Sequence, residues 1–126
     1  MFARKITVLA FAVLAGFACL YAADITGKWT AEFDTQVGLQ KYVFEFKVEG
    51  DKLTGKATAD IAGAASKSDL QEGKMSGDEI SFVEMQEYQG QQVKIVYKGK
   101  VSGNEIKFTR NVADMANEEL VAKRVK

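Results

Sequence analysis

The sequence predicts an all-β protein: a single eight-stranded antiparallel barrel with up-and-down topology that follows an N-terminal signal peptide. Two observations predict the barrel. A tight-turn signature, in which glycine precedes Asp or Asn between two apolar positions, recurs at Gly50, Gly77 and Gly103. This signature is typical of two-residue hairpin loops, and its recurrence indicates a repeated hairpin unit. Apolar and polar residues alternate on both sides of these turns, which is the period of a strand and not of a helix.

Residues 1–23 have the features of a secretory signal peptide. Two basic residues precede an apolar run over residues 6–18, which is too short to span a bilayer. Small residues allow cleavage after either Ala22 or Ala23, and the sequence does not choose between them. We therefore expect residues 24–126 to form one domain that is secreted or periplasmic and makes no stable membrane association once the signal is removed.

The composition excludes several classes of function. The only cysteine, Cys19, lies in the signal peptide, so no disulfide is expected, and the residues before it form a poor lipobox. The chain has no histidine, which removes a common metal ligand and the commonest general base. Removal of Arg4 and Lys5 from 17 basic residues leaves 15 against 17 acidic ones. This balance gives no footprint for nucleic acid, and no metal or cofactor is expected.

Strand limits follow from the turns and from the alternation between them. The alternation is clearest over residues 42–48 and 93–97. Residues 112–120 are long enough for a turn of helix but lack an apolar stripe. We expect strands at residues 27–34, 40–49, 52–60, 67–76, 79–86, 91–102, 105–112 and 118–125.

Two-residue loops fix which residues point inward. One step from the apolar pairs beside the turns, each glycine faces a phenylalanine, in the pairs Phe46–Gly55, Gly73–Phe82 and Gly99–Phe108. This arrangement is typical of sharply coiled strands, where a ring covers the exposed backbone. The alternative is that these glycines are only weak strand positions. Coiled strands favour a closed barrel without free edges, and an open two-sheet sandwich is the alternative architecture.

Up-and-down topology places alternate connections at opposite ends. The three tight turns share one end with both termini, and we expect that end to be plugged. The connections at the other end are expected to be looser and to form the mouth of the barrel; they cover residues 35–39, 61–67, 87–91 and 113–117.

Polar residues enter the predicted interior toward this mouth. The third inward layer contains Gln71 opposite Glu84 and Tyr97 opposite Arg110, and the fourth contains Tyr42. We take these five residues as candidate ligand contacts. Arg110 would anchor an anionic or hydroxyl group with its fork of donors, Glu84 would hold that fork, and Tyr97 would form a wall. The alternative is a filled lumen in which Arg110 pairs with Glu84 and Tyr97 bridges them.

The N-terminal strand carries a resemblance. Ile-Thr-Gly-Lys-Trp at 25–29 resembles the Gly-x-Trp opening of calycins, the group of lipocalins and avidins, and Leu-Thr-Gly at 53–55 resembles the second avidin-type hairpin. The resemblance implies a lipocalin/avidin-like β-barrel over residues 24–126, with Trp29 packed at the closed end beneath Arg124. The Thr-Asp-Tyr segment of lipocalins and the stacking tryptophans of avidin are missing, so biotin binding is not implied. The chain is also similar to small exported bacterial modules.

These observations predict an exported, non-catalytic barrel that binds a small polar ligand or a saccharide at its open end. Asp69 and Glu84 are two inward carboxylates, but no nucleophile, metal set or phosphate loop accompanies them. The alternative is a hydrolase inhibitor or another protein-interaction module, whose partner is a protein and whose lumen is filled and purely structural.

Overall fold

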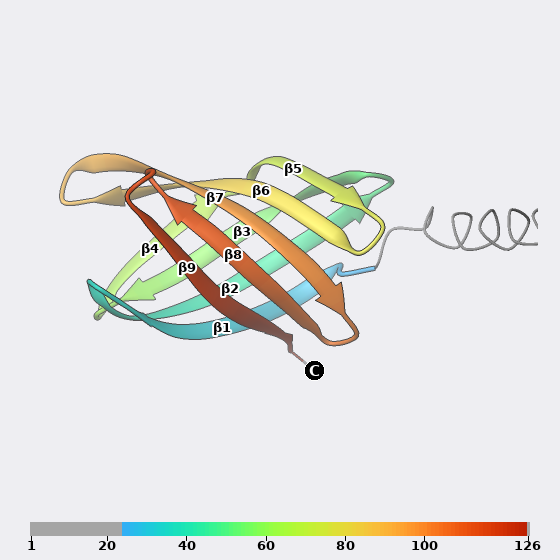
Figure 1. Ribbon diagram of the computed structural model, residues 1–126, viewed down its shortest axis with the longest axis horizontal. Helices are drawn as coiled ribbons and strands as arrows, with labels where there is room; N and C mark the ends of the chain where they lie inside the picture. The colour runs from blue at the N-terminus through green and yellow to red at the C-terminus, as the bar shows by residue number, and fades with distance from the viewer. Residues whose placement is uncertain (1–23, 126) are drawn as a thin grey trace, which may run out of the picture.

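The computed structural model describes residues 24–125, and every regular element in that range is a strand (Figure 1). The predicted signal peptide, its cut position and Cys19 lie outside the described residues. Over the described range, no helix is long and apolar enough to cross a membrane. The strands are β1 (Gly27–Thr35), β2 (Gly38–Glu49), β3 (Lys52–Ile61), β4 (Ala64–Asp69), β5 (Gln71–Ser76), β6 (Glu79–Tyr88), β7 (Gln91–Ser102), β8 (Glu105–Val112) and β9 (Ala116–Arg124).

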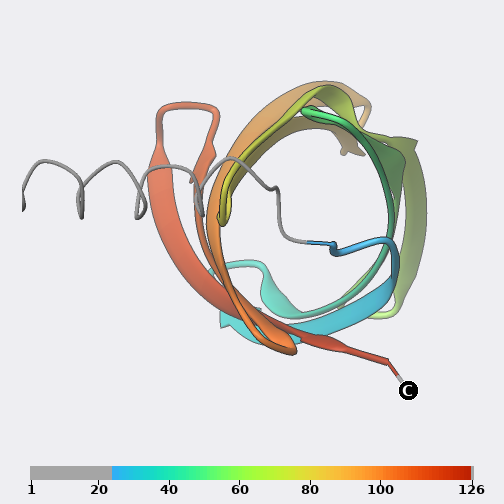
Figure 2. The same ribbon diagram turned by 90° about the vertical axis from the view of Figure 1, so that its right-hand side faces the viewer.

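The strands close into a ring (Figure 2). Each pairs in antiparallel fashion with its neighbours in the order β2-β1-β9-β8-β7-β6-β5-β3-β4, and an additional pairing of β2 with β3 completes the circle. β4 and β5 flank Leu70 and together occupy the place of the single strand predicted at 67–76. The predicted eight-stranded antiparallel barrel is therefore confirmed, and the open sandwich is not observed.

The register at the three tight turns is the predicted one. Val48 pairs with Leu53, and the corresponding apolar pairs form at the other two turns. The turn glycines Gly50, Gly77 and Gly103 have φ angles of 61° to 63°, a conformation that costs glycine little. All three turns lie at the right-hand end in Figure 1, together with both ends of the described chain.

The predicted register fails in β5, because this strand contains a β-bulge. Glu72 has a φ of 52°, and Glu72 and Gly73 together stand opposite Phe82. Two residues opposite one shift all preceding positions by one, which exchanges their faces. Gln71 consequently pairs with Val83 and is exposed. The prediction that Gln71 faces the lumen opposite Glu84 is wrong.

The shifted register continues through β4. Ser68 pairs with the buried Ala57 of β3, so Ser68 points inward, whereas Asp69 points outward and is exposed. Asp69 and Glu84 therefore lie on opposite faces of the barrel wall, which contradicts their expected place in one interior.

The remaining strand glycines permit close approach in two different ways. A Cβ atom on Gly99 would lie 2.6 Å from the ring of Phe108, its predicted partner. At Gly55 and Gly73 the obstacle would instead be a backbone carbonyl of the neighbouring strand, at 1.8 Å and 1.9 Å. Glycine at these positions thus allows the backbones of neighbouring strands to approach closely where the barrel is strongly coiled.

The connections at the far end are tighter than predicted. Between the observed strands lie only two residues at 36–37, 62–63 and 89–90, and three at 113–115. Ala62, Gln89, Ala113 and Asp114 have positive φ angles, which is typical of compact hairpin turns. The barrel therefore has no long loops around its mouth, and residues 112–120 form a turn and a strand without a helix.

Candidate functional site

The closed end is organised by Trp29 and Arg124, which pair across β1 and β9. The Trp29 ring is fully buried, and its Nε1 donates to the carbonyl oxygen of Ile25 at 2.8 Å. The guanidinium carbon of Arg124 lies 4.4 Å from the ring centroid, a cation–π contact. Arg124 also donates to the backbone oxygen of Asp24 at 3.0 Å and to Asn104 Oδ1 at 3.1 Å. These contacts fasten the N-terminal segment over the end of the barrel.

A network of four buried polar side chains fills the lumen above an aromatic core. Tyr97 donates to Glu84 Oε1 at 2.8 Å, and the Tyr42 hydroxyl lies 3.0 Å from both oxygens of the same carboxylate. Arg110 Nη1 donates to the hydroxyls of Tyr97 and Tyr42 at 2.9 Å and 3.2 Å. All four residues are at most 1% exposed. Arg110 and Glu84 are thus connected through two tyrosine hydroxyls in place of the direct ion pair considered above.

Residues that the sequence did not single out complete this network. Arg110 Nε forms an ion pair with Glu118 Oε1 at 2.7 Å, and its Nη2 donates to Gln40 Oε1 at 2.9 Å. Gln86 Nε2 donates to the Tyr42 hydroxyl at 2.9 Å. A signal for Glu118 was present, because it lies two residues before Leu120 and so shares its inward face.

Burial and the contacts within the network shift the pKa values of its ionisable groups. Loss of solvent raises the pKa of Glu84, and hydrogen bonds from Tyr97 and Tyr42 and the charge of Arg110 offset part of this rise. Burial also raises the pKa of both tyrosines, so their hydroxyls remain donors. Burial alone would lower the pKa of Arg110, but contacts with Tyr97, Tyr42 and Glu118 raise it instead. The guanidinium therefore stays charged.

The lumen is filled at the level of this network. Four of the five predicted ligand contacts, Tyr42, Glu84, Tyr97 and Arg110, come together there, but they satisfy one another and are sealed from solvent. The fifth, Gln71, is exposed on the outer face. The Ser68 hydroxyl is buried and has no hydrogen-bond partner among the described residues.

The barrel wall has a seam between β1 and β9. Only two residue pairs join these nine-residue strands, Trp29–Arg124 and Thr30–Lys123. One further bond, from the amide of Val125 to the oxygen of Lys28, extends the contact at the closed end. In the part of the chain that the structure describes, no ladder pair connects residues 31–35 with residues 116–122. The two strands separate toward the left in Figure 1, and in Figure 2 the β8–β9 turn lies outside the ring.

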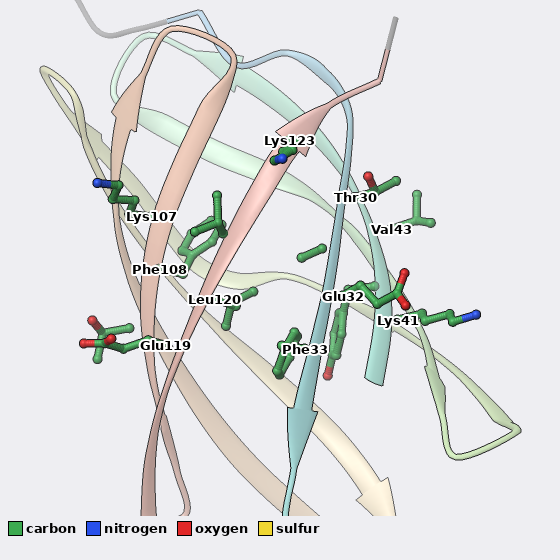
Figure 3. A pocket seen from close by; sticks show the side chains of 14 residues that line it. Thr30, Glu32, Phe33, Lys41, Val43, Lys107, Phe108, Glu119, Leu120 and Lys123 are labelled. Atoms are coloured by element: carbon green, nitrogen blue, oxygen red, sulfur yellow. The ribbon is translucent and has the colours of Figure 1, made fainter. Parts of the chain in front are cut away.

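A cleft of about 920 Å³ lies along this seam. Figure 3 shows Phe33 and Leu120 between the diverging strands, with charged side chains around them. The floor consists of the half-buried Phe33 and of four buried residues that are at most 5% exposed, namely Ala31, Tyr42, Phe108 and Leu120. The rim carries five charged residues, namely Glu32, Lys41, Lys107, Glu119 and Lys123.

A few large hydrophobic side chains are exposed on the segments that lead into and out of β1 and β9. Among the described side chains, the large hydrophobic ones that are exposed lie in or beside the β1–β2 and β8–β9 turns or on β9 and the residue after it. They are Val37, Leu39, Met115, Val121 and Val125. Of these residues, Val121 lines the cleft.

Comparison of the chain with protein-family models, with curated proteins and with solved structures finds no match. Among residues 24–125, no group of three or more His, Cys, Asp or Glu side chains is placed to hold a metal ion. The seam cleft and the filled lumen are therefore the features from which a function can be inferred.

Proposed function

We propose that the protein is an exported, non-catalytic binding module that takes its ligand in the cleft between β1 and β9 and not inside the lumen. The observation that carries this proposal is the interrupted β1–β9 ladder, which leaves a cleft with an apolar floor in the barrel wall. A concave apolar surface with polar groups at its margin is the usual form of a binding site.

The filled lumen favours the cleft over the open end that the sequence suggested. A saccharide or another small polar ligand at the level of Arg110 would have to displace hydrogen bonds among buried groups. Removing a partner from a buried charge is strongly unfavourable, so such a ligand would need to replace nearly every contact that it breaks. A ligand in the seam breaks none of them.

Three further observations support the other parts of the proposal. The carboxylate of Glu84 is sealed from solvent while Asp69 lies on the outer face, which supports a non-catalytic role. The packing of Arg124 over Trp29 supports a calycin-like relationship of the lipocalin or avidin type. The basic and apolar segments at the N-terminus support export to the periplasm or the medium.

The proposal can be tested with the neutral fluorescent probe N-phenyl-1-naphthylamine, titrated into ¹⁵N-labelled exported protein. The amide resonances of residues 31–35 and 116–122 should shift, and those of Tyr97 and Arg110 should not. Val121→Glu places a charge at the lip of the cleft and should weaken binding several-fold, because the apolar probe would then contact a hydrated carboxylate.

Val96→Glu is the matched control, because Val96 is an outward residue of β7 away from the cleft. It should leave the affinity for the probe unchanged. Shifts confined to the network around Arg110, or equal effects of the two substitutions, would contradict the proposed site.

A further inference from the structure

We propose that the occupant of the cleft is an extended peptide, in which apolar residues alternate with lysine or arginine, and that it pairs with the free edges of β1 and β9 as an additional strand. This inference rests on the proposed function and names the class of partner. It differs from a small-molecule site because the backbone of the barrel, and not only its side chains, would provide the contacts.

The first support is the unpaired backbone on both sides of the seam. In a strand, every second residue turns its N–H and C=O groups toward each neighbour. Along residues 31–35 of β1 and 116–122 of β9, the groups directed at the seam have no ladder partner in the described chain. Each free edge is about as long as a typical strand of five or six residues. A single inserted strand could therefore hydrogen-bond to both edges at once.

The second support is that two of the usual protections against strand addition, proline and β-bulges, are missing from both edges, although β9 carries the inward-pointing charge of Glu118. Natural edges are commonly blocked by proline, by bulges or by shortening. The chain contains no proline, and the registers of β1 with β2 and of β9 with β8 run without a shift. Both edges are thus regular templates for a further strand, a recurring mode of peptide recognition.

The third support is the alternation of side chains along the seam. Ala31 and Phe33 on β1 and Leu120 on β9 point inward and form part of the apolar floor. Glu32 and Glu119 point outward. An incoming strand has the same period of two. Apolar side chains at every second position would cover Phe33 and Leu120, and the side chains between them would join the outer face.

The charges on the two edges favour a basic peptide. The outward residues of the separated parts include three carboxylates, from Glu32 and Asp34 on β1 and Glu119 on β9. Lys41 on β2 lies directly opposite Glu32, and Lys107 on β8 lies opposite Val121, so each can offset one carboxylate from the neighbouring strand, while Lys123 belongs to the paired end of the seam. The separated parts of β1 and β9 themselves carry carboxylates and no lysine or arginine. Opposite charges on neighbouring strands stabilise a sheet, so outward lysine or arginine side chains fit between these carboxylates.

The test uses a seven-residue peptide of alternating valine and lysine, with both ends capped. It should bind and slow hydrogen exchange of the seam-facing amides in residues 31–35 and 116–122. The same peptide with N-methyl groups on alternate amides keeps its side chains but loses backbone donors. Its affinity should fall by about tenfold or more, since each lost hydrogen bond weakens binding several-fold.

Charge reversal at the edge supplies a matched pair of variants. Glu119→Lys should weaken binding of the valine–lysine peptide and strengthen binding of a valine–glutamate peptide. Glu79→Lys changes an exposed glutamate at the closed end of β6, away from the cleft, and should change neither affinity.

The outcomes separate this inference from the proposed function. If N-phenyl-1-naphthylamine shifts the seam amides but the peptide does not bind, or binds equally well when N-methylated, strand addition is wrong and the binding cleft stands. If neither probe perturbs the seam, both proposals fail. A concentration-dependent dimer that protects the same amides without peptide would identify a second copy of the chain as the occupant and would overturn the peptide proposal.

Discussion

Arg110 shows how a buried charge can serve the structure of a small barrel. Its guanidinium donates to Glu118, Gln40 and two tyrosine hydroxyls, and it also lies 4.6 Å from the centroid of the Phe33 ring. The five donors of an arginine are arranged in a fixed fork, so one side chain can tie several strands together. Phe33 also belongs to the floor of the seam cleft. Its contact with Arg110 therefore links the polar network in the lumen to the candidate site.

Replacement of Arg110 by methionine should destabilise the protein by about 3–5 kcal/mol, because the Glu84 carboxylate would remain buried without the nearby positive charge. Urea denaturation measures the change in the free energy of unfolding. The double variant Arg110→Met, Glu84→Met also removes the buried carboxylate and should recover part of the loss. The recovery is partial because Glu118 still lacks its ion-pair partner and the Tyr42 and Tyr97 hydroxyls lack their acceptor. A single variant as stable as the wild type would show that the network contributes little to stability.

At the scale of the strand, a substitution at Gly99 tests whether glycine is needed there to pack against Phe108 or is only a weak strand position. Gly99 pairs with Phe108, and an added Cβ would lie 2.6 Å from that ring. Gly99→Val should therefore destabilise by about 1–3 kcal/mol through overpacking, although valine favours strands. The control Lys100→Val changes the next, outward and exposed position and should have little effect in the same urea titration. Equal effects would contradict the packing role.

The pattern of residues predicted most strands and their register, because turn glycines and alternation act locally. The bulge in β5 was not predictable in this way. Glu72, a residue type that seldom adopts a positive φ, takes that conformation, and the alternating pattern of residues indicates only curvature at the following glycine. One inserted position then moved Gln71 and Asp69 to the outer face. The predicted inward orientation was therefore confirmed for the candidate residues on the regular strands β2, β6, β7 and β8, and it was wrong for Gln71 on the irregular one.

The seam is a property of the closed molecule and has no signature in either strand. β1 and β9 alternate as regularly as the other strands, and the ends of the chain contribute both of them. Whether they pair along their full length depends on how the whole ring coils. The sequence indicated closure, but the incomplete last pairing, on which the proposed function depends, could be found only in three dimensions.

The closure of the whole barrel should depend on Arg124, because β1 and β9 are joined only beside it. Arg124→Met keeps the apolar length of the side chain but removes the cation over Trp29 and the donors to Asp24 and Asn104. Loss of these contacts should open the seam through to the closed end. Hydrogen exchange of the amides paired between Thr30 and Lys123 should then accelerate, while exchange in β6, β7 and β8 should stay close to the wild-type rates.

Lys123→Met is the control for this prediction, because Lys123 is the exposed neighbour of Arg124 on the same strand and points outward. It should change exchange little anywhere in the barrel. Local opening requires that the seam be a weaker unit than the rest of the sheet, and its short ladder supports this requirement. Acceleration spread evenly over all strands in the Arg124 variant would mean that the barrel opens only by global unfolding. The edges of β1 and β9 would then not open separately from the rest of the barrel, and the proposed cleft between them would be contradicted.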